Sequence, residues 1–92
     1  MSRKFSNNSD LFQFISTLID ELREINELYW VSEFKNAMSV SSLSGEILGA
    51  LRLNLLKFQK TDFPKKLRVN KDVREAIKGL DKALGYWRPD NL

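Results

Sequence analysis

Residues 10–25 read DLFQFISTLIDELREI, and this stretch decides the fold class. Its apolar residues recur at alternating steps of four and three, at Leu11, Ile15, Leu18, Leu22 and Ile25. That spacing places them on one face of an amphipathic helix. Asp10 can accept hydrogen bonds from the backbone N–H groups of the first turn, and Gln13 resembles the second half of a capping box. We therefore predict a helix over residues 10–25, preceded by a flexible arm over residues 1–9.

The apolar residues that follow do not continue this face. An unbroken helix would carry the stripe through Tyr29 to Ser32. The apolar residues are instead Trp30, Val31, Phe34, Ala37 and Met38. Asn26 is the residue near this phase shift best able to adopt the left-handed conformation that ends a helix. We predict a break there and a second helix over residues 27–39, with one long helix as the alternative.

Two more helices are expected in the second half of the chain. Four serines between positions 39 and 44 indicate a turn, because serine favours helix starts over interiors. Residues 42–60 are apolar around much of the helical circumference, which is typical of a central helix, and Pro64 follows its end. The last helix is expected over residues 70–85, with Asn70 as its cap and Gly85 as its left-handed end.

No segment shows convincing period-two alternation of apolar and polar residues, and no hairpin dipeptide such as Asn-Gly or Asp-Gly occurs. The helices thus predict an all-α fold, a single-domain bundle of about four helices. We expect the domain to span residues 10–87 and residues 88–92 to form a tail.

The residue content excludes most catalytic chemistries. The 92 residues include neither Cys nor His, so this chain cannot supply a Cys nucleophile, a His-based triad or a thiolate–imidazole zinc site.

No apolar run reaches the roughly 18 residues of a membrane span. Near the amino end, Arg3 and Lys4 lead into polar residues rather than a signal-peptide core. We expect a cytoplasmic protein that needs no cofactor and contacts no membrane.

Charge is divided unevenly along the chain. Residues 1–46 carry 4 basic and 7 acidic residues, whereas residues 47–92 carry 11 and 5, which gives the net charge of +3. The densest basic stretch spans residues 57–74 and contains Lys57, Lys60, Lys65, Lys66, Arg68, Lys71 and Arg74. Such a cluster can neutralise nucleic-acid phosphates, with Phe63 available to stack on a base. An ordinary solvated helix face explains the same charges.

Acidic residues crowd the second half of the first predicted helix. Glu21, Glu24 and Glu27 are three apart and project from neighbouring positions. Their Glu-x-x-Glu spacing resembles the metal motif of the all-α nucleotide pyrophosphohydrolases, with Asp72 and Glu75 as the second acidic pair. The resemblance covers these five positions and implies a Mg²⁺-dependent hydrolase of a phosphorylated small molecule. A solvated helix face explains this spacing too.

The acidic residues also oppose the dipole of their own helix, which a basic neighbour would offset. We therefore expect the acidic end of the first helix near the basic loop or the last helix. The alternative is that the acidic and basic faces lie apart and meet a second copy or another partner.

Small and aromatic residues suggest further contacts. Gly45 and Gly49 form a small-x-x-x-small pair, which we attribute to close packing inside the bundle. Two pairs of adjacent aromatic residues occur, Tyr29–Trp30 and Tyr86–Trp87. The two members of a pair cannot both enter one core, because adjacent helical residues point about 100° apart. We expect the tryptophans inside and the tyrosines near the surface, where tyrosine anchors protein contacts.

Together these patterns favour a non-enzymatic protein–protein interaction module whose partner is another protein or a second copy of itself. The predicted contact residues are Tyr29 and Tyr86 with either the acidic set Glu21, Glu24 and Glu27 or the basic set Lys65, Lys66, Arg68 and Lys71. Nucleic-acid binding through residues 57–74 and Mg²⁺-dependent hydrolysis remain the alternatives.

Overall fold

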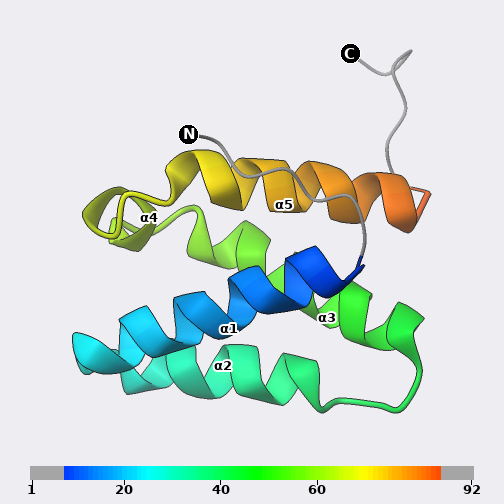
Figure 1. Ribbon diagram of the computed structural model, residues 1–92, viewed down its shortest axis with the longest axis horizontal. Coiled ribbons are helices and arrows are strands. Elements are labelled where there is room, and N and C mark those ends of the chain that lie inside the picture. The colour runs from blue at the N-terminus through cyan, green and yellow to red at the C-terminus, as the bar shows by residue number, and fades with distance from the viewer. Residues whose placement is uncertain (1–7, 86–92) are drawn as a thin grey trace.

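The computed structural model describes residues 8–85, which form five helices and no strand. These are α1 (Asn8–Glu24), α2 (Leu28–Met38), α3 (Ser44–Phe58), α4 (Phe63–Lys66) and α5 (Asn70–Ala83). The four longer helices run alternately in opposite directions, and α2 and α3 each lie between two neighbours (Figure 1). The predicted all-α bundle is therefore confirmed.

The turn between α1 and α2 has the geometry that the phase shift predicted. Asn26 has a φ of 60°. Its N–H donates to the carbonyl of Arg23 at 3.0 Å, and the N–H of Glu27 donates to the carbonyl of Leu22 at 2.9 Å. These two bonds form a Schellman motif, in which a left-handed residue closes the helix. The break at Asn26 is confirmed, and α1 and α2 are separate helices.

Several predicted boundaries move by one or two residues. Helix α1 begins at Asn8, so Asp10 lies in its first turn and does not precede it. Residues 1–7 of the predicted arm and the predicted tail over residues 88–92 lie outside the described residues. Helix α3 begins two residues later than predicted. Val69 precedes α5, so Asn70 is its first residue and no side chain caps it. Gly85 has a φ of 79°, which confirms the predicted left-handed end after α5.

The segment between the predicted helices 42–60 and 70–85 was expected to be a basic loop, but it contains the short helix α4. Its first turn includes Pro64, and a second Schellman motif closes it. The N–H of Arg68 donates to the carbonyl of Lys65 at 3.2 Å, and the N–H of Val69 donates to that of Pro64 at 2.8 Å. Arg68 takes the left-handed position with a φ of 58°. No glycine or asparagine marked this turn in the sequence.

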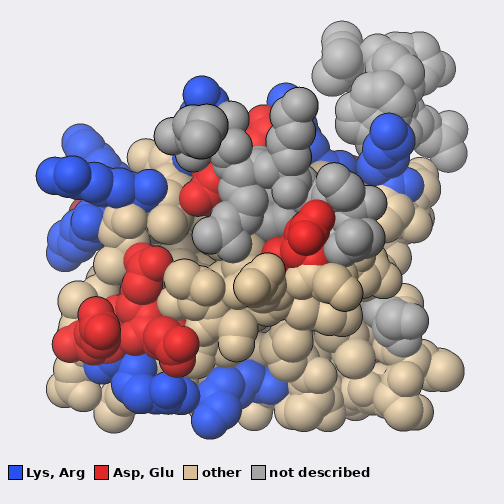
Figure 2. All heavy atoms as spheres, in the orientation of Figure 1, with Lys and Arg blue, Asp and Glu red and all other residues tan. Residues whose placement is uncertain are grey.

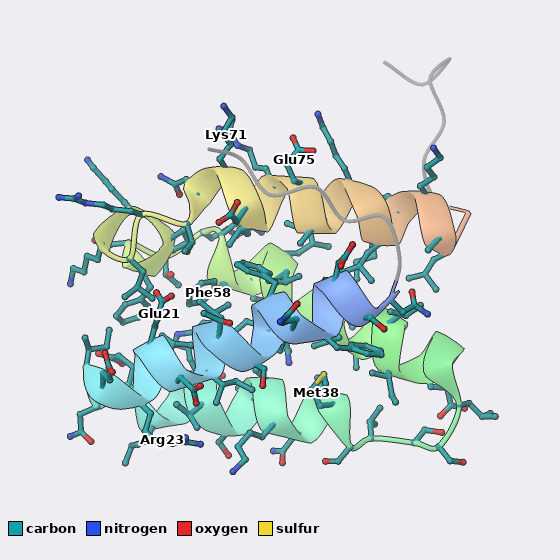
Figure 3. All side chains as sticks on the ribbon, viewed as in Figure 1. Glu21, Arg23, Met38, Phe58, Lys71 and Glu75 are labelled. Atoms are coloured by element: carbon teal, nitrogen blue, oxygen red, sulfur yellow. The ribbon has the colours of Figure 1, made fainter. Side chains whose placement is uncertain are left out.

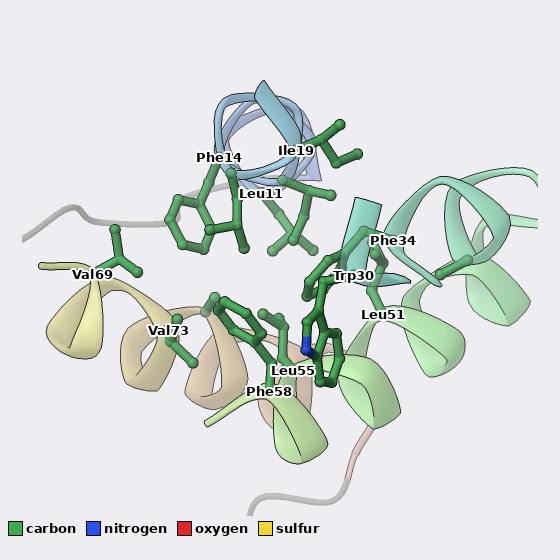
Figure 4. Packing of buried hydrophobic residues seen from close by; sticks show 14 of the residues in the cluster. Leu11, Phe14, Ile19, Trp30, Phe34, Leu51, Leu55, Phe58, Val69 and Val73 are labelled. Atoms are coloured by element: carbon green, nitrogen blue, oxygen red, sulfur yellow. The ribbon is translucent and has the colours of Figure 1, made fainter. Parts of the chain in front are cut away.

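One continuous hydrophobic core lies between the helices (Figure 4). Four residues of the predicted α1 stripe are buried, namely Leu11, Ile15, Leu18 and Leu22. The stripe is wider than predicted, because Phe14 and Ile19 are buried too. The fifth predicted member, Ile25, is exposed because it lies in the turn beyond the end of α1.

Aromatic rings form the centre of this core. Phe58 at the end of α3 lies 5.1 Å from Trp30 and 5.4 Å from Phe34, measured between ring centroids, in edge-to-face arrangements. Phe63 of α4 stacks on the same ring at 6.2 Å. Such pairs add about 0.5–1.5 kcal/mol each beyond area burial. Phe58 therefore joins α2, α3 and α4.

Helix α3 packs against both α2 and α5, as expected for the central helix. Only one side of it is buried, as the 56% exposure of Leu53 shows.

The predicted role of Gly45 and Gly49 is wrong. A Cβ atom built on either glycine would meet no neighbouring atom within 4 Å, so neither residue serves close packing inside the bundle.

Candidate functional site

The turn that joins α1 to α2 exposes a small apolar surface. We call residues 20–29 the acidic turn. Ile25, Leu28 and Tyr29 are 44%, 57% and 64% exposed there. All three residues lie within four positions of Asn26, where the Schellman motif reverses the chain. Large apolar side chains gathered on a surface typically mark a contact site for another molecule.

Carboxylates lie close in sequence to these apolar residues. Glu24 is exposed, and Glu21 and Glu27 are half-buried. The acidic turn contains four carboxylates, those of Asp20 and these three glutamates, and one cation, Arg23. Arg23 pairs with Asp20 at 3.4 Å. Figure 3 shows Glu21 and Arg23 near the end of α1. The acidic turn thus contains three exposed apolar side chains and four carboxylates.

The aromatic pair in this turn divides as predicted. Trp30 is buried in the core, and Tyr29 is exposed. The Tyr29 ring meets the Trp30 ring edge to face, with 5.3 Å between centroids and 83° between planes. An aromatic side chain supported in this way offers apolar area at a low conformational-entropy cost, which suits it to anchor a partner. Tyr86, the other predicted tyrosine, lies outside the described residues.

A second charged surface consists of basic residues near α4. We call it the basic surface, and its members, all exposed, are Lys57, Lys60, Lys65, Lys66, Arg68, Lys71 and Arg74. Within residues 8–85, none of them lies within 4.0 Å of a carboxylate oxygen. Both charged surfaces lie at the same end of the bundle, where Figure 2 shows acidic and basic side chains as separate groups. The acidic end of α1 thus shares this end with the basic segment, but no ion pair joins them in the described part of the chain.

Phe63 does not project freely from the basic surface. Its ring stacks on Phe58 with 9° between planes, and the Nζ atom of Lys66 lies 5.5 Å from its centroid. The ring packs α4 against the core. Phe63 is half-buried, and base stacking by its ring stays a prediction.

The carboxylates that suggested a metal site are not brought together. Glu75 lies on α5 and projects away from α1, whereas Glu21 belongs to α1 (Figure 3). Glu75 also lies 3.9 Å from Lys78. Among residues 8–85, no three acidic side chains lie close enough together to hold a metal ion. The five positions of the hydrolase resemblance thus form no metal-binding group there.

Comparisons with models of protein families, with curated proteins and with solved structures find no match. None of the helices within residues 8–85 combines the length and the apolar character that crossing a bilayer requires. A function therefore has to be argued from the two charged surfaces and the exposed apolar residues.

Proposed function

We propose that this protein is an interaction module that binds a basic, amphipathic segment of another protein at the acidic turn. The observation that carries the proposal is the exposure of Ile25, Leu28 and Tyr29 within five consecutive residues. Glu21, Glu24 and Glu27 flank them. An apolar centre supplies binding free energy, and a charged rim selects the partner by its charge.

The magnitudes support apolar anchoring as the main source of affinity. Full burial of a Leu or Tyr side chain contributes about 1.5–3 kcal/mol, whereas an exposed ion pair contributes about 0.2–1 kcal/mol. Leu28 and Tyr29 are therefore expected to dominate affinity. The glutamates are expected to increase the association rate and to reject acidic partners.

Two synthetic helical peptides test this proposal. Both peptides carry the same leucine face. The polar face consists of lysines in one peptide and of glutamates in the other. We expect the lysine peptide to bind and the glutamate peptide not to bind, as measured by calorimetry. Leu28→Ala and Tyr29→Ala should each weaken binding of the lysine peptide at least about tenfold, the effect of losing about 1.4 kcal/mol.

Leu53→Ala is the matched control, because Leu53 is as exposed as Leu28 but lies in the middle of α3. It should leave the peptide affinity unchanged. Equal binding of the two peptides would contradict the proposal, and so would equal effects of Leu28→Ala and Leu53→Ala.

We propose nucleic-acid binding by the basic surface as a second candidate. It is supported by the exposure of all seven cations and by their lack of carboxylate neighbours within residues 8–85. With Phe63 used in packing, the contacts would be mainly to phosphates. Such binding is sequence-independent and falls steeply with salt, by an exponent of about 0.7 per phosphate on single strands.

A single-stranded RNA oligonucleotide tests this candidate. Replacing Lys65, Lys66, Arg68 and Lys71 together by alanine should abolish binding and its salt dependence. Lys35→Ala is the control, because Lys35 is an exposed cation on α2. A salt-independent affinity would exclude the nucleic-acid candidate.

A further inference from the structure

The outward side of α3 carries one large apolar side chain, Leu53, that the bundle leaves exposed, beside Ala50 and Leu56, which also pack against the core. Leu53 is 56% exposed, whereas Leu51 and Leu55 are fully buried. Successive helical residues are about 100° apart, so Leu53 lies opposite these two. Gly49, Ala50 and Leu56 are half-buried and lie on the same side as Leu53. We call these four residues with Glu46 and Lys57 the outer face of α3.

Polar contacts on both flanks of α3 fix this orientation. Arg52 pairs with Asp81 of α5 through its Nε atom. The Nδ2 atom of Asn54 donates to the carbonyl of Glu33 in α2 at 2.8 Å. Arg52 and Asn54 immediately precede and follow Leu53, so they hold α3 against α5 on one flank and α2 on the other. Leu53 is thereby directed away from the bundle.

The outer face also offers space beside Leu53. Gly49 lies one turn before Leu53, and a Cβ atom there would meet no neighbouring atom within 4 Å. The backbone at Gly49 is therefore open, and a leucine from another helix can approach it closely. Leu53 projects from the same face. This face therefore carries both a protruding leucine and, at Gly49, an open backbone position against which another leucine can pack.

Charges at the two ends of the outer face are complementary to each other. Glu46 lies near the start of α3 and Lys57 near its end, and both side chains are exposed. They are eleven residues apart, about three helical turns, which places them on the same side of α3. A second α3 running antiparallel brings Glu46 of each copy to Lys57 of the other. A parallel arrangement would place like charges together.

We infer that the occupant of the outer face is a second copy of this chain, with the two α3 helices antiparallel about a twofold axis. Leu53 of each copy then packs over Gly49 and Ala50 of the other, and each Glu46–Lys57 contact occurs twice. This is the self-complementary pattern of a symmetric dimer. The face between Glu46 and Lys57 is about 16 Å long, so the interface is small and the dimer dissociates when the chain is diluted below the high micromolar range.

Sedimentation equilibrium across a range of concentrations tests this inference. We expect the unaltered chain to be a dimer at high micromolar concentration. Leu53→Lys should raise the dissociation constant more than tenfold. Leu28→Lys adds the same charge at a leucine of similar exposure and should leave the dimer intact. Circular dichroism of both variants checks that the helices are retained.

Charge reversal tests the antiparallel arrangement. Glu46→Lys and Lys57→Glu should each weaken the dimer about tenfold, because each creates two like-charge contacts. The double variant restores both contacts and should regain most of the original affinity. A chain that remains monomeric at millimolar concentration would overturn the inference, and so would a double variant no better than the single ones. These results do not depend on peptide binding at the acidic turn.

Discussion

Adding a methyl group at Gly49 should affect stability in opposite directions according to the sequence and the structure. The sequence suggested close packing that a methyl group would disturb, whereas the structure leaves room for it. Glycine in a helix interior is about 1 kcal/mol less favourable than alanine, and a Cβ atom at Gly49 meets no neighbour within 4 Å. We therefore expect Gly49→Ala to raise the free energy of unfolding by about 0.5–1 kcal/mol. Urea denaturation at a concentration that keeps the chain monomeric measures this change. A loss of stability would instead indicate close packing inside the bundle.

Arg68 adopts a backbone conformation that an arginine side chain disfavours. Its φ of 58° lies in the left-handed region, where residues other than glycine and asparagine lose about 1–2 kcal/mol. Arg68→Gly removes this strain from the folded state but increases the conformational entropy of the unfolded chain. The first effect is larger, so the variant should raise the free energy of unfolding by roughly 0.5 kcal/mol. The control, Lys66→Gly, removes the same charge from a helical position of α4 and should destabilise it. Thermal unfolding distinguishes the two variants, and equal effects would contradict the assignment of strain.

At the scale of helices, sequence prediction succeeded where the apolar period was long. The buried stripe of α1 persists for about three turns, from Leu11 to Leu22. The phase shift between α1 and α2 coincides with Asn26, a residue that tolerates the left-handed conformation. Helix α4 has four residues and therefore no readable period. The exposure of Ile25 was missed because the stripe was extended one residue beyond the end of α1. The acidic residues and Tyr29 of the candidate site were thus predictable, but the exposure of Ile25 and Leu28 was not.

The turn at Asn26 connects helix geometry to the candidate site. A β-branched residue is strongly disfavoured at a φ of 60°, so Asn26→Val should lower the free energy of unfolding by about 1–2 kcal/mol. Asn26→Gly should be neutral or slightly stabilising, because glycine is the usual residue at this position of a Schellman motif. Chemical denaturation followed by circular dichroism measures both changes. If Asn26→Val were neutral, the left-handed turn would not be what ends α1.

At the scale of the whole molecule, the sequence showed two halves of opposite charge but not where they meet. Charge counts carry no distances, so separate faces and neighbouring ones were equally consistent with the sequence. In the structure both charged surfaces lie at one end of the bundle, without an ion pair between them in the described residues (Figure 2). Within residues 8–85, neither surface therefore neutralises the other. The outer face of α3 was beyond sequence prediction for a related reason, since only the packing against α2 and α5 shows which side of α3 is uncovered.

The single core implies that the helices unfold together, and Phe58 is the residue that tests this. It is fully buried and contacts aromatic rings from α2 and α4. Phe→Ala in a core lowers stability by about 3–5 kcal/mol, and a chain of 92 residues has about 5–14 kcal/mol in total. We expect Phe58→Ala to bring the protein close to unfolding at 25 °C and Phe58→Leu to be milder. Circular dichroism and tryptophan fluorescence should give the same transition, since the helices and buried Trp30 are lost together. Two separate transitions would show instead that α1 and α2 can remain folded without the rest of the bundle.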